Sequence, residues 1–301
     1  MSPTAQSSKR FEGIIVALLT PFDAQGEVKE DSLRALVRFE TDKGVNGLYP
    51  CGTAGSGAIM RLDQRKKVAE IVVDESKGRT PVMIHVGEAS TEGSAELAKH
   101  AEKIGADALG CVTPYYYRPD DASLERHFRK IAETTELPLY LYNLPRYTNV
   151  NITPDLALRL SSVPNIVGIK DSSRDFVQIL QYLEELPKDF TVICGTDAYI
   201  FPALLMGAKG AITAYSNPFP EIYVELYRSF KQKEYEKAAR VQFKLNSIRE
   251  ILDKPALAPL YEALRMRGMD MGNARPPLRP MTNTEVSALH RKLVELKALE
   301  S

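Results

Sequence analysis

The chain has 301 residues, of which 44% are apolar and 26% charged, the balance of an ordinary globular protein whose core needs no disulfide or metal to hold it together. Its 39 basic residues equal its 39 acidic residues, so a net charge of zero gives no electrostatic reason to bind nucleic acid or an anionic membrane. No run approaches the length of about 18 apolar residues that a membrane-spanning helix requires, so we expect none.

The three cysteines, Cys51, Cys111 and Cys194, are odd in number and widely spaced. This pattern is typical neither of a disulfide framework nor of a zinc site. We expect them to be small buried residues of a reduced, cytoplasmic protein. Residues 1–10 are polar and lack the apolar segment of a signal peptide, so we expect a flexible tail.

Short apolar runs alternate with amphipathic segments from residue 11 to residue 228. Most of the runs are apolar throughout, as strands buried on both faces should be. The runs are Gly13–Leu19, Gly47–Cys51, Val82–Val86, Ala108–Val112, Leu139–Tyr142, Ile166–Ile169, Phe190–Cys194 and Gly210–Thr213. Strands that alternate with helices imply βαβ crossovers and a parallel sheet.

Eight such units predict an α/β fold, a (β/α)₈ TIM barrel over residues 11–228. An open doubly wound sheet is the alternative, but it usually carries a glycine-rich first turn, whereas the first run here ends in Leu19-Thr20-Pro21-Phe22. Beyond residue 228 the strand pattern stops. Helices are predicted at Lys233–Asp253, Ala256–Arg267 and Thr284–Leu299, so residues 229–301 should form a helical appendix and not a second catalytic domain.

The residues that end or follow the strands should meet at the C-terminal mouth of the barrel, where TIM-barrel enzymes carry their active sites. This set is rich in hydroxyl groups and contains one lysine. It comprises Thr20, Gly52-Thr53-Ala54-Gly55, Glu88, Thr113 with Tyr115-Tyr116-Tyr117, Tyr142-Asn143, Lys170-Asp171, Gly195-Thr196-Asp197 and Ser216-Asn217.

Lys170 closes an otherwise apolar strand. Lost solvation at a barrel mouth disfavours its ammonium form and yields an amine that can attack a carbonyl. The alternatives are a lysine that reaches out to solvent and one that pairs with Asp171. Tyr142 ends the preceding strand, and its phenol can carry protons during imine formation and C–C cleavage. Its alternative is an aromatic residue that only packs at the barrel rim.

The turn Gly52-Thr53-Ala54-Gly55 presents backbone N–H groups that suit a carboxylate, although a tight βα turn without a ligand is the alternative. The run Tyr115-Tyr116-Tyr117 is ambiguous between packing and reaching across an interface. His85 lies inside a strand, the other histidines lie on predicted helices, and no metal-binding pair is visible. We therefore expect neither a metal nor another cofactor.

Together, these residues resemble the dihydrodipicolinate synthase and N-acetylneuraminate lyase family of class I aldolases over nearly the whole chain. The motifs are Gly52-Thr53-Ala54-Gly55, Val112-Thr113-Pro114-Tyr115-Tyr116, Leu141-Tyr142-Asn143-Leu144-Pro145 and Gly168-Ile169-Lys170-Asp171. The resemblance implies a barrel with a C-terminal helical appendix, pyruvate and an aldehyde or sugar acid as substrates, and a homotetramer built from two dimers.

By that resemblance, Lys170 forms a Schiff base with a 2-oxo acid and Tyr142 is the catalytic phenol. Thr53 would orient the phenol and, with the backbone of Ala54, hold the pyruvyl carboxylate. Tyr116 would be lent to the site of a neighbouring subunit. The residues expected to bind substrate are Gly52, Ala54, Asp197 and Thr213.

The chain departs from the family at specialised positions. The turn usually reads Gly-Thr/Ser-Thr-Gly-Glu, and Ala54 here loses a hydroxyl group. Synthases normally carry Tyr-Asn-x-Pro-x-Arg, whose arginine grips the second substrate, whereas here Arg146 comes one residue early and Tyr147 takes its place. Sialate lyases have an Asp-Glu pair after the seventh strand, and here the pair is Asp197-Ala198.

The stretches Pro114-Tyr115-Tyr116-Tyr117 and Lys170-Asp171 more closely resemble 2-keto-3-deoxy-sugar-acid aldolases. Together with the missing synthase arginine, they favour a carbon–carbon lyase that releases pyruvate from a 2-keto-3-deoxy sugar acid. The enzyme alternatives are 4-hydroxy-tetrahydrodipicolinate synthase, N-acetylneuraminate lyase and a dehydratase of keto-deoxy acids. The non-enzyme alternative is a degenerate barrel that binds a 2-oxo acid without turnover, motivated by Ala54 and the displaced Arg146.

Overall fold

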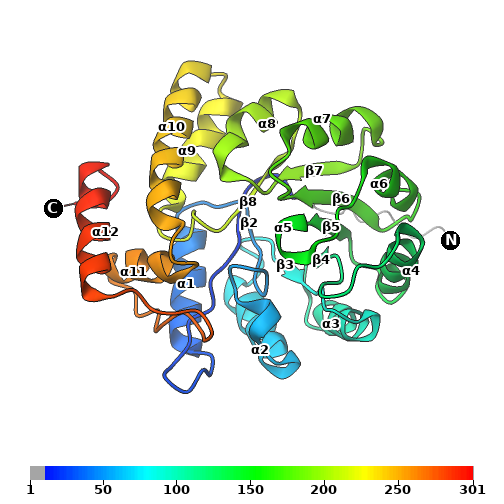
Figure 1. Ribbon diagram of the computed structural model, residues 1–301, viewed down its shortest axis with the longest axis horizontal. Coiled ribbons are helices and arrows are strands. Elements are labelled where there is room, and N and C mark those ends of the chain that lie inside the picture. The colour runs from blue at the N-terminus through cyan, green and yellow to red at the C-terminus, as the bar shows by residue number, and fades with distance from the viewer. Residues whose placement is uncertain (1–10, 301) are drawn as a thin grey trace.

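The structure is a computed structural model that describes residues 11–300, and the expected tail at residues 1–10 lies outside them. Eight parallel strands form one sheet in the order β2-β1-β8-β7-β6-β5-β4-β3 (Figure 1). A parallel bridge between Leu48 and Val82 joins its two ends and closes the ring. The predicted TIM barrel is confirmed, and the open-sheet alternative is wrong because the edges of β2 and β3 meet.

Each strand is followed by at least one helix. The strands are β1 (Gly13–Val16), β2 (Gly47–Leu48), β3 (Met83–His85), β4 (Ala108–Val112), β5 (Leu139–Asn143), β6 (Ile166–Asp171), β7 (Thr191–Cys194) and β8 (Gly210–Thr213). The helices of the barrel are α1 (Glu30–Asp42), η1 (Gly57–Ile59), α2 (Leu62–Ser76), α3 (Thr91–Lys103), α4 (Asp121–Ala132), α5 (Pro145–Thr148), α6 (Pro154–Leu160), α7 (Phe176–Glu185), η2 (Asp197–Tyr199), α8 (Ile200–Met206) and α9 (Pro220–Lys231). The helices that follow are α10 (Tyr235–Leu252), α11 (Ala258–Met266) and α12 (Asn283–Glu295).

The first two strands end earlier than their apolar runs predict, β1 at Val16 and β2 at Leu48. The segments that follow β1 and β2 remain adjacent, since the Leu18 amide donates to the Tyr49 carbonyl at 3.0 Å. Cys51 then adopts a φ of 62°, a left-handed conformation outside the β region. The two apolar runs in the sequence therefore extend beyond the last residues of the strands β1 and β2.

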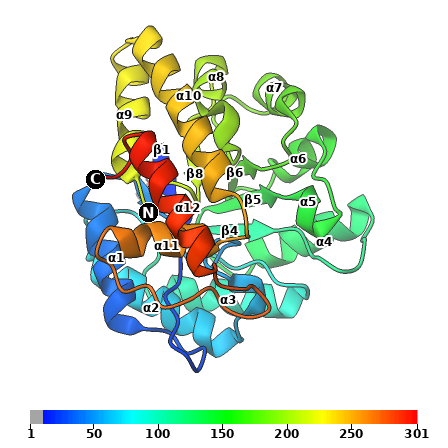
Figure 2. The same cartoon turned by 60° about the vertical axis from the view of Figure 1, so that its left-hand side comes forward.

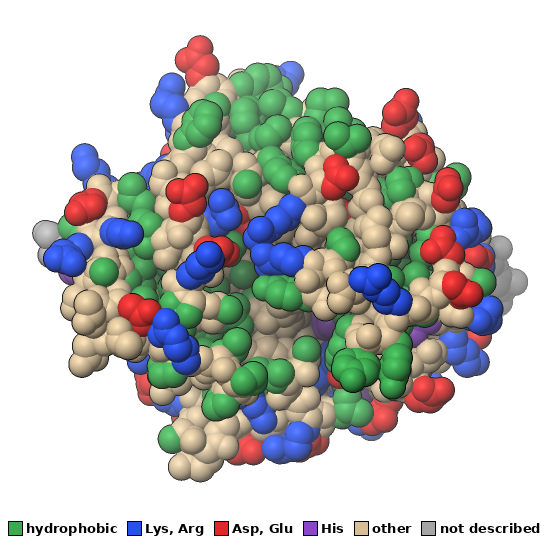
Figure 3. Space-filling view, viewed as in Figure 1, with side chains coloured by type: hydrophobic (Ala, Val, Ile, Leu, Met, Phe, Trp, Pro, Cys, Tyr) green, Lys and Arg blue, Asp and Glu red, His purple; other side chains and the backbone are tan. Residues whose placement is uncertain are grey.

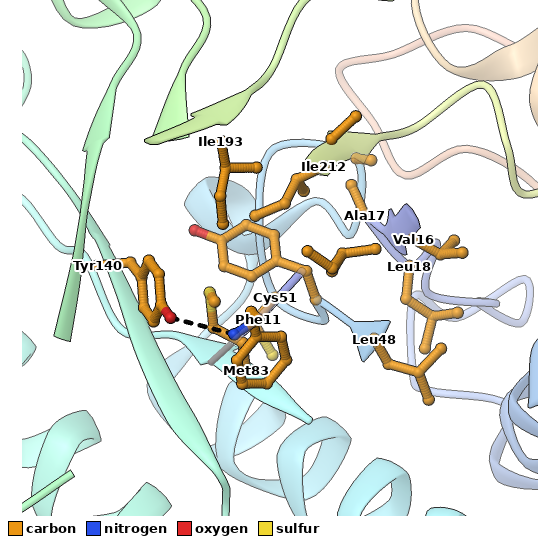
Figure 4. Close-up of a cluster of buried hydrophobic side chains, with 14 of the residues drawn as sticks. Phe11, Val16, Ala17, Leu18, Leu48, Cys51, Met83, Tyr140, Ile193 and Ile212 are labelled. Carbon is orange, nitrogen blue, oxygen red and sulfur yellow. Dashed lines mark hydrogen bonds between the residues drawn. The ribbon is translucent and has the colours of Figure 1, made fainter. Parts of the chain in front are cut away.

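Side chains fill the barrel interior, so that it is a packed core and not a pore. In Figure 4, Met83, Ile193 and Ile212 point toward a common centre, whereas Val16 and Leu48 lie on the outer side of their strands, and all five are buried. Toward the N-terminal end, the Phe11 amide donates to the Tyr140 hydroxyl at 3.2 Å. The polar residues at the C-terminal mouth lie outside this packed core and are therefore available to line a site.

The C-terminal helices form the predicted appendix beside the barrel (Figure 2). The predicted boundary at residue 228 lies inside α9, which continues to Lys231. On α11, Tyr261 donates from its hydroxyl to the Thr20 carbonyl at 2.8 Å, and Phe22 bridges to Gly272. The appendix is therefore attached to the loop that follows β1.

The three cysteines are buried and free, and burial raises the pKa of Cys51 to about 11 and that of Cys111 to about 12. Their predicted role as small interior residues is confirmed. Within residues 11–300, no helix has both the length and the apolar character that crossing a bilayer demands.

Glu40 on α1 is fully buried, and neither of its carboxylate oxygens has a hydrogen-bond partner among the described residues. Burial raises its pKa well above the usual range, Glu221 adds to the rise, and Arg267 opposes it. The folded state therefore binds a proton that the unfolded state releases above a pKa of about 4.3. Stability contributed by this proton is present at low pH and is lost as pH rises toward the raised pKa.

We expect Glu40→Gln to stabilise the fold increasingly with pH, because the amide is neutral at every pH. The gain in unfolding free energy should grow by up to about 1.4 kcal/mol per pH unit above pH 4.3. Denaturant unfolding at pH 4.5, 6 and 8 measures it, with exposed Glu250→Gln on α10 as the matched control. A difference between Glu40→Gln and wild type that does not change with pH would contradict the prediction.

Candidate active site at the C-terminal mouth of the barrel

Lys170 and Tyr142 are the penultimate residues of adjacent strands and lie opposite each other in the register of β5 and β6. The Lys170 side chain is 5% exposed, and its Nζ lies 4.0 Å from the centre of the Tyr142 ring and 4.9 Å from that of Tyr49. Such ring faces attract a cationic nitrogen. The alternative of a lysine that reaches out to solvent is wrong, because the amine is enclosed by aromatic rings.

Asp171 takes part in a separate network and forms no salt bridge with Lys170. Its carboxylate accepts hydrogen bonds from Asn143 Nδ2 at 2.8 Å, Ser173 Oγ at 2.6 Å and Gln178 Nε2 at 3.2 Å. Burial raises the pKa of Asp171, and these donors oppose the rise. The pairing alternative for Lys170 is therefore also wrong, and its amine remains available for chemistry.

The turn after β2 brings Thr53 to the Tyr142 phenol, with Thr53 Oγ1 3.5 Å from the Tyr142 hydroxyl. The turn is tight, since the Gly57 amide donates to the Gly52 carbonyl at 3.0 Å. Within residues 11–300, the backbone amides of Thr53 and Ala54 have no hydrogen-bond acceptor. Free amides in a turn of this kind suit a carboxylate.

Asp197 and Thr213 come together at the ends of β7 and β8, but they engage each other. The Thr213 hydroxyl donates to Asp197 Oδ1, and the Tyr223 hydroxyl donates to the same oxygen at 2.8 Å. Both Asp197 and Thr213 are buried, and burial raises the pKa of Asp197 against these two hydrogen bonds. Their part in substrate binding stays a prediction.

Tyr116 points away from the body of its own subunit. Its side chain is 88% exposed, its φ is 81°, and its ring contacts that of Tyr117, itself 79% exposed, at 5.1 Å. The interpretation in which Tyr116 packs within its own subunit is wrong. Tyr115 is the tyrosine of the run that packs inward, against the cluster of Val112, Tyr142 and Leu144.

The model of the dihydrodipicolinate synthetase family matches residues 10–296. The 4-hydroxy-tetrahydrodipicolinate synthase of Methanothrix thermoacetophila is 37% identical over 291 residues, 96% of this chain and 98% of the relative. The chain belongs to the dihydrodipicolinate synthetase family.

Further members of this family are similar over the same length. The synthase of Bacillus subtilis is 34% identical over 288 residues, 95% of this chain and 99% of the relative. The crystal structure of YagE from E. coli K12, a family member in complex with pyruvate, has a TM-score of 0.93 at 31% identity and covers 96% of this chain and 99% of its own. The chain is thus a lyase-type, pyruvate-dependent aldolase by family.

Arg146, which comes one residue before the family's arginine position, lies exposed on α5. Its guanidinium stacks over the Tyr147 ring at 4.5 Å and donates to the Tyr147 hydroxyl at 3.0 Å. The arginine and the tyrosine that replaces it therefore contact each other outside the buried part of the site.

Sequence reasoning missed Arg65, Tyr49 and the importance of His85. Arg65 on α2 is 1% exposed and donates to the carbonyls of His85 at 2.7 Å and Gly87 at 3.0 Å, and it pairs with Glu88. A signal existed, because residue 65 lies three and seven positions before Val68 and Val72, on the same buried helix face.

Gly195 has no side chain, and the Lys170 side chain passes close to it. A Cβ added there would lie 2.0 Å from Ser172 Oγ and 3.1 Å from Lys170 Cε. The same Cβ would lie 2.7 Å from the backbone carbonyl oxygen of Asp171, so Gly195→Ala should shift the backbone at the end of β6 and the lysine with it. We expect kcat to fall by at least about tenfold, since misplacing a reacting group by about 1 Å costs up to about 100-fold. Steady-state kinetics measures it.

The control is Gly93→Ala on α3, where an added Cβ comes no closer than 3.1 Å to any atom. Wild-type kcat in Gly195→Ala, with the fold retained, would show that the space beside Lys170 is not needed.

Proposed function

We propose that the protein forms a Schiff base between Lys170 and pyruvate, and uses it to break or make a bond between C3 of pyruvate and an aldehyde carbon. The observation that carries the proposal is the enclosed, unpaired Lys170 amine against the ring of Tyr142, whose hydroxyl is 3.5 Å from Thr53. Lysine is the side chain that supplies a primary amine for imine formation.

The steps follow from this placement. In the cleavage direction, the amine attacks the C2 carbonyl of the 2-oxo acid, and the carbinolamine loses water to give an iminium. The C4 hydroxyl then loses its proton, C4 leaves as the aldehyde, and the iminium accepts the electron pair of the broken C3–C4 bond. The product is an enamine, which is protonated at C3 and hydrolysed to release pyruvate and the amine. Condensation runs these steps in reverse. Tyr142 carries protons between the nitrogen, the C2 oxygen and the C4 hydroxyl, and the amides of Thr53 and Ala54 hold the carboxylate.

The comparisons favour condensation of pyruvate, because the relatives at 37% and 34% identity are named 4-hydroxy-tetrahydrodipicolinate synthases. Cleavage of a 2-keto-3-deoxy sugar acid is the second candidate. It is supported by Arg146, which stacks on Tyr147 at the protein surface and so differs from the family's substrate-gripping arginine. This ranking places the synthase ahead of the sugar-acid lyase that the sequence motifs favoured.

One assay separates the candidates and tests the proposal. The wild-type protein is incubated with pyruvate and aspartate semialdehyde, and separately with 2-keto-3-deoxygluconate and N-acetylneuraminate. Faster condensation supports the synthase, and faster pyruvate release supports the lyase. No turnover of any of them, together with no imine trapped by borohydride in the presence of pyruvate, would support the degenerate binding barrel.

The assembly is part of this proposal. We infer a homotetramer in which Tyr116 of one subunit completes the site of its neighbour. Exposed apolar residues support contact surfaces, namely Tyr116 and Tyr117 after β4, and Val177, Leu205 and Met206 on α7 and α8. Figure 3 shows hydrophobic side chains gathered over α7 and α8. Large exposed patches of this kind mark interfaces, and sedimentation that finds an active monomer at assay concentration would contradict the shared site.

A further inference from the structure

His85 is a buried residue at the end of β3 that contacts both halves of the candidate site. Its side chain is 6% exposed, and its Nδ1 lies 3.1 Å from the carbonyl oxygen of Cys51. Its ring meets that of Tyr142 edge to face, with centres 6.0 Å apart and planes at 86°. One side chain thus bridges the turn after β2 and the phenol at the end of β5.

The tautomer of His85 follows from its partners. Nδ1 lies 3.1 Å from the Cys51 carbonyl oxygen, which only accepts, and 3.3 Å from Arg65 Nη2, which only donates. Because that Nη2 already donates to the His85 carbonyl at 2.7 Å, we assign the Nδ1 proton to the closer hydrogen bond with Cys51. Burial lowers the pKa of His85 well below the usual range, and the charges of Arg65 and Lys170 lower it further, so the ring stays neutral. Its Nε2 then bears a lone pair, and this buried atom has no partner among the described residues.

Cys51 is the residue that this hydrogen bond holds. Its backbone has a φ of 62°, a left-handed conformation that is costly for a residue with a side chain and persists only when its surroundings enforce it. Cys51 directly precedes Gly52, Thr53 and Ala54, the turn that places Thr53 Oγ1 3.5 Å from the Tyr142 hydroxyl. The Cys51 carbonyl shares a peptide plane with the Gly52 amide, so its direction sets how the chain enters this turn.

Arg65 fixes the backbone of His85 through a hydrogen bond. Its Nη2 donates to the His85 carbonyl at 2.7 Å, and its own carbonyl lies 3.5 Å from Cys51 Sγ. On the other side, the Tyr49 ring meets His85 at 5.7 Å and Tyr142 at 6.2 Å, both edge to face. The three rings are thus mutually perpendicular and restrict one another.

We propose that His85 is a positioning residue that serves the two halves of the site separately: its Nδ1–H orients the carboxylate-binding turn through Cys51, and its ring holds the edge of Tyr142. This inference rests on the proposed Schiff-base function. It predicts that pyruvate affinity depends on the Nδ1–H group and that proton transfer depends on the ring.

Two substitutions separate these roles. His85→Asn places an amide N–H near the Nδ1 position and removes the ring, whereas His85→Phe keeps a ring against Tyr142 and removes the donor. The probe is pyruvate alone in D₂O. Conversion of the iminium to the enamine takes a proton from C3, the electron pair moves to nitrogen, and return of a deuteron labels the methyl group, which NMR follows over time.

We expect His85→Asn to lower the maximal exchange rate by at least about tenfold and to leave the half-saturating pyruvate concentration within about twofold. We expect His85→Phe to raise the half-saturating concentration by about three- to tenfold, the effect of one lost hydrogen bond, and to leave the maximal rate within about threefold. A residue with a merely structural role would change both quantities together in both variants.

His127 on α4 is the matched control. It is also buried, its Nδ1 lies 2.9 Å from Thr91 Oγ1, and its ring meets Phe128 edge to face at 5.2 Å. His127→Asn and His127→Phe should leave both quantities at wild-type values. The same split in the His127 variants would overturn the proposal.

Parallel changes in the two His85 variants, or none, would also overturn it. The His85→Asn and His85→Phe results are interpreted separately. If circular dichroism shows that one variant does not fold, the other variant still tests the proposal. Failure of the proposed function is distinguishable, because the wild-type protein would then neither exchange the methyl protons of pyruvate nor trap an imine.

Discussion

Lys170→Ala should abolish both turnover and the covalent labelling of the protein by pyruvate and borohydride. Hydride reduces the iminium to a secondary amine, which adds about 72 Da to wild-type Lys170, and alanine has no nitrogen that could form this bond. We expect turnover to fall by at least about three orders of magnitude. Intact-protein mass spectrometry and peptide mapping measure the label, and a continuous pyruvate assay measures turnover.

The fold should survive this change, because Lys170 lies at the mouth and not in the packed layers of the barrel. Lys209→Ala, on the loop between α8 and β8, is a suitable control and should keep both label and activity. An adduct mapped to another lysine, or an active Lys170→Ala protein, would refute the proposed mechanism.

Tyr142→Phe should lower kcat by about 10²–10⁴-fold, the usual contribution of a positioned proton carrier. The phenyl ring still covers the Lys170 amine, so borohydride in the presence of pyruvate should still label the lysine, although more slowly. The expected signature is therefore a protein that can be labelled but turns over poorly. Loss of turnover is measured by steady-state kinetics, and the label by mass spectrometry.

Tyr140→Phe is the control on the same strand. Its hydroxyl accepts from the Phe11 amide at the opposite end of the barrel (Figure 4), so its removal should cost about 0.5–1.5 kcal/mol of stability and leave kcat unchanged. Equal losses of kcat in the two variants would indicate general damage to β5 and contradict the role of Tyr142.

Much of the barrel could be predicted from local pattern, because burial on both faces leaves apolar runs and each run needs a helix to return the chain. The same regularity brought Lys170 and Tyr142 together, since they end neighbouring strands and parallel strands end at one mouth. Strand ends were predicted less well, as at Cys51, because apolar composition records burial and not the point where pairing stops.

The partners of polar side chains were decided by the tertiary structure. Asp171 follows Lys170 in the chain, yet its carboxylate binds Asn143 and Gln178. Whether Asp197 faces a substrate or Thr213 and Tyr223 likewise depends on residues 16 and 26 positions away. Sequence order cannot specify such contacts, because they exist only once the ring has closed.

The sequence by itself therefore determined the barrel, the family and the residues at its mouth, since these depend on periodicity and on short motifs. Closure of β2 against β3 decided how the residues beneath that mouth meet. Arg65 from α2, His85 from β3 and Cys51 after β2 contact one another because the first and last strands in the sheet order become neighbours. That contact depends on the geometry of the closed ring, which no local pattern encodes.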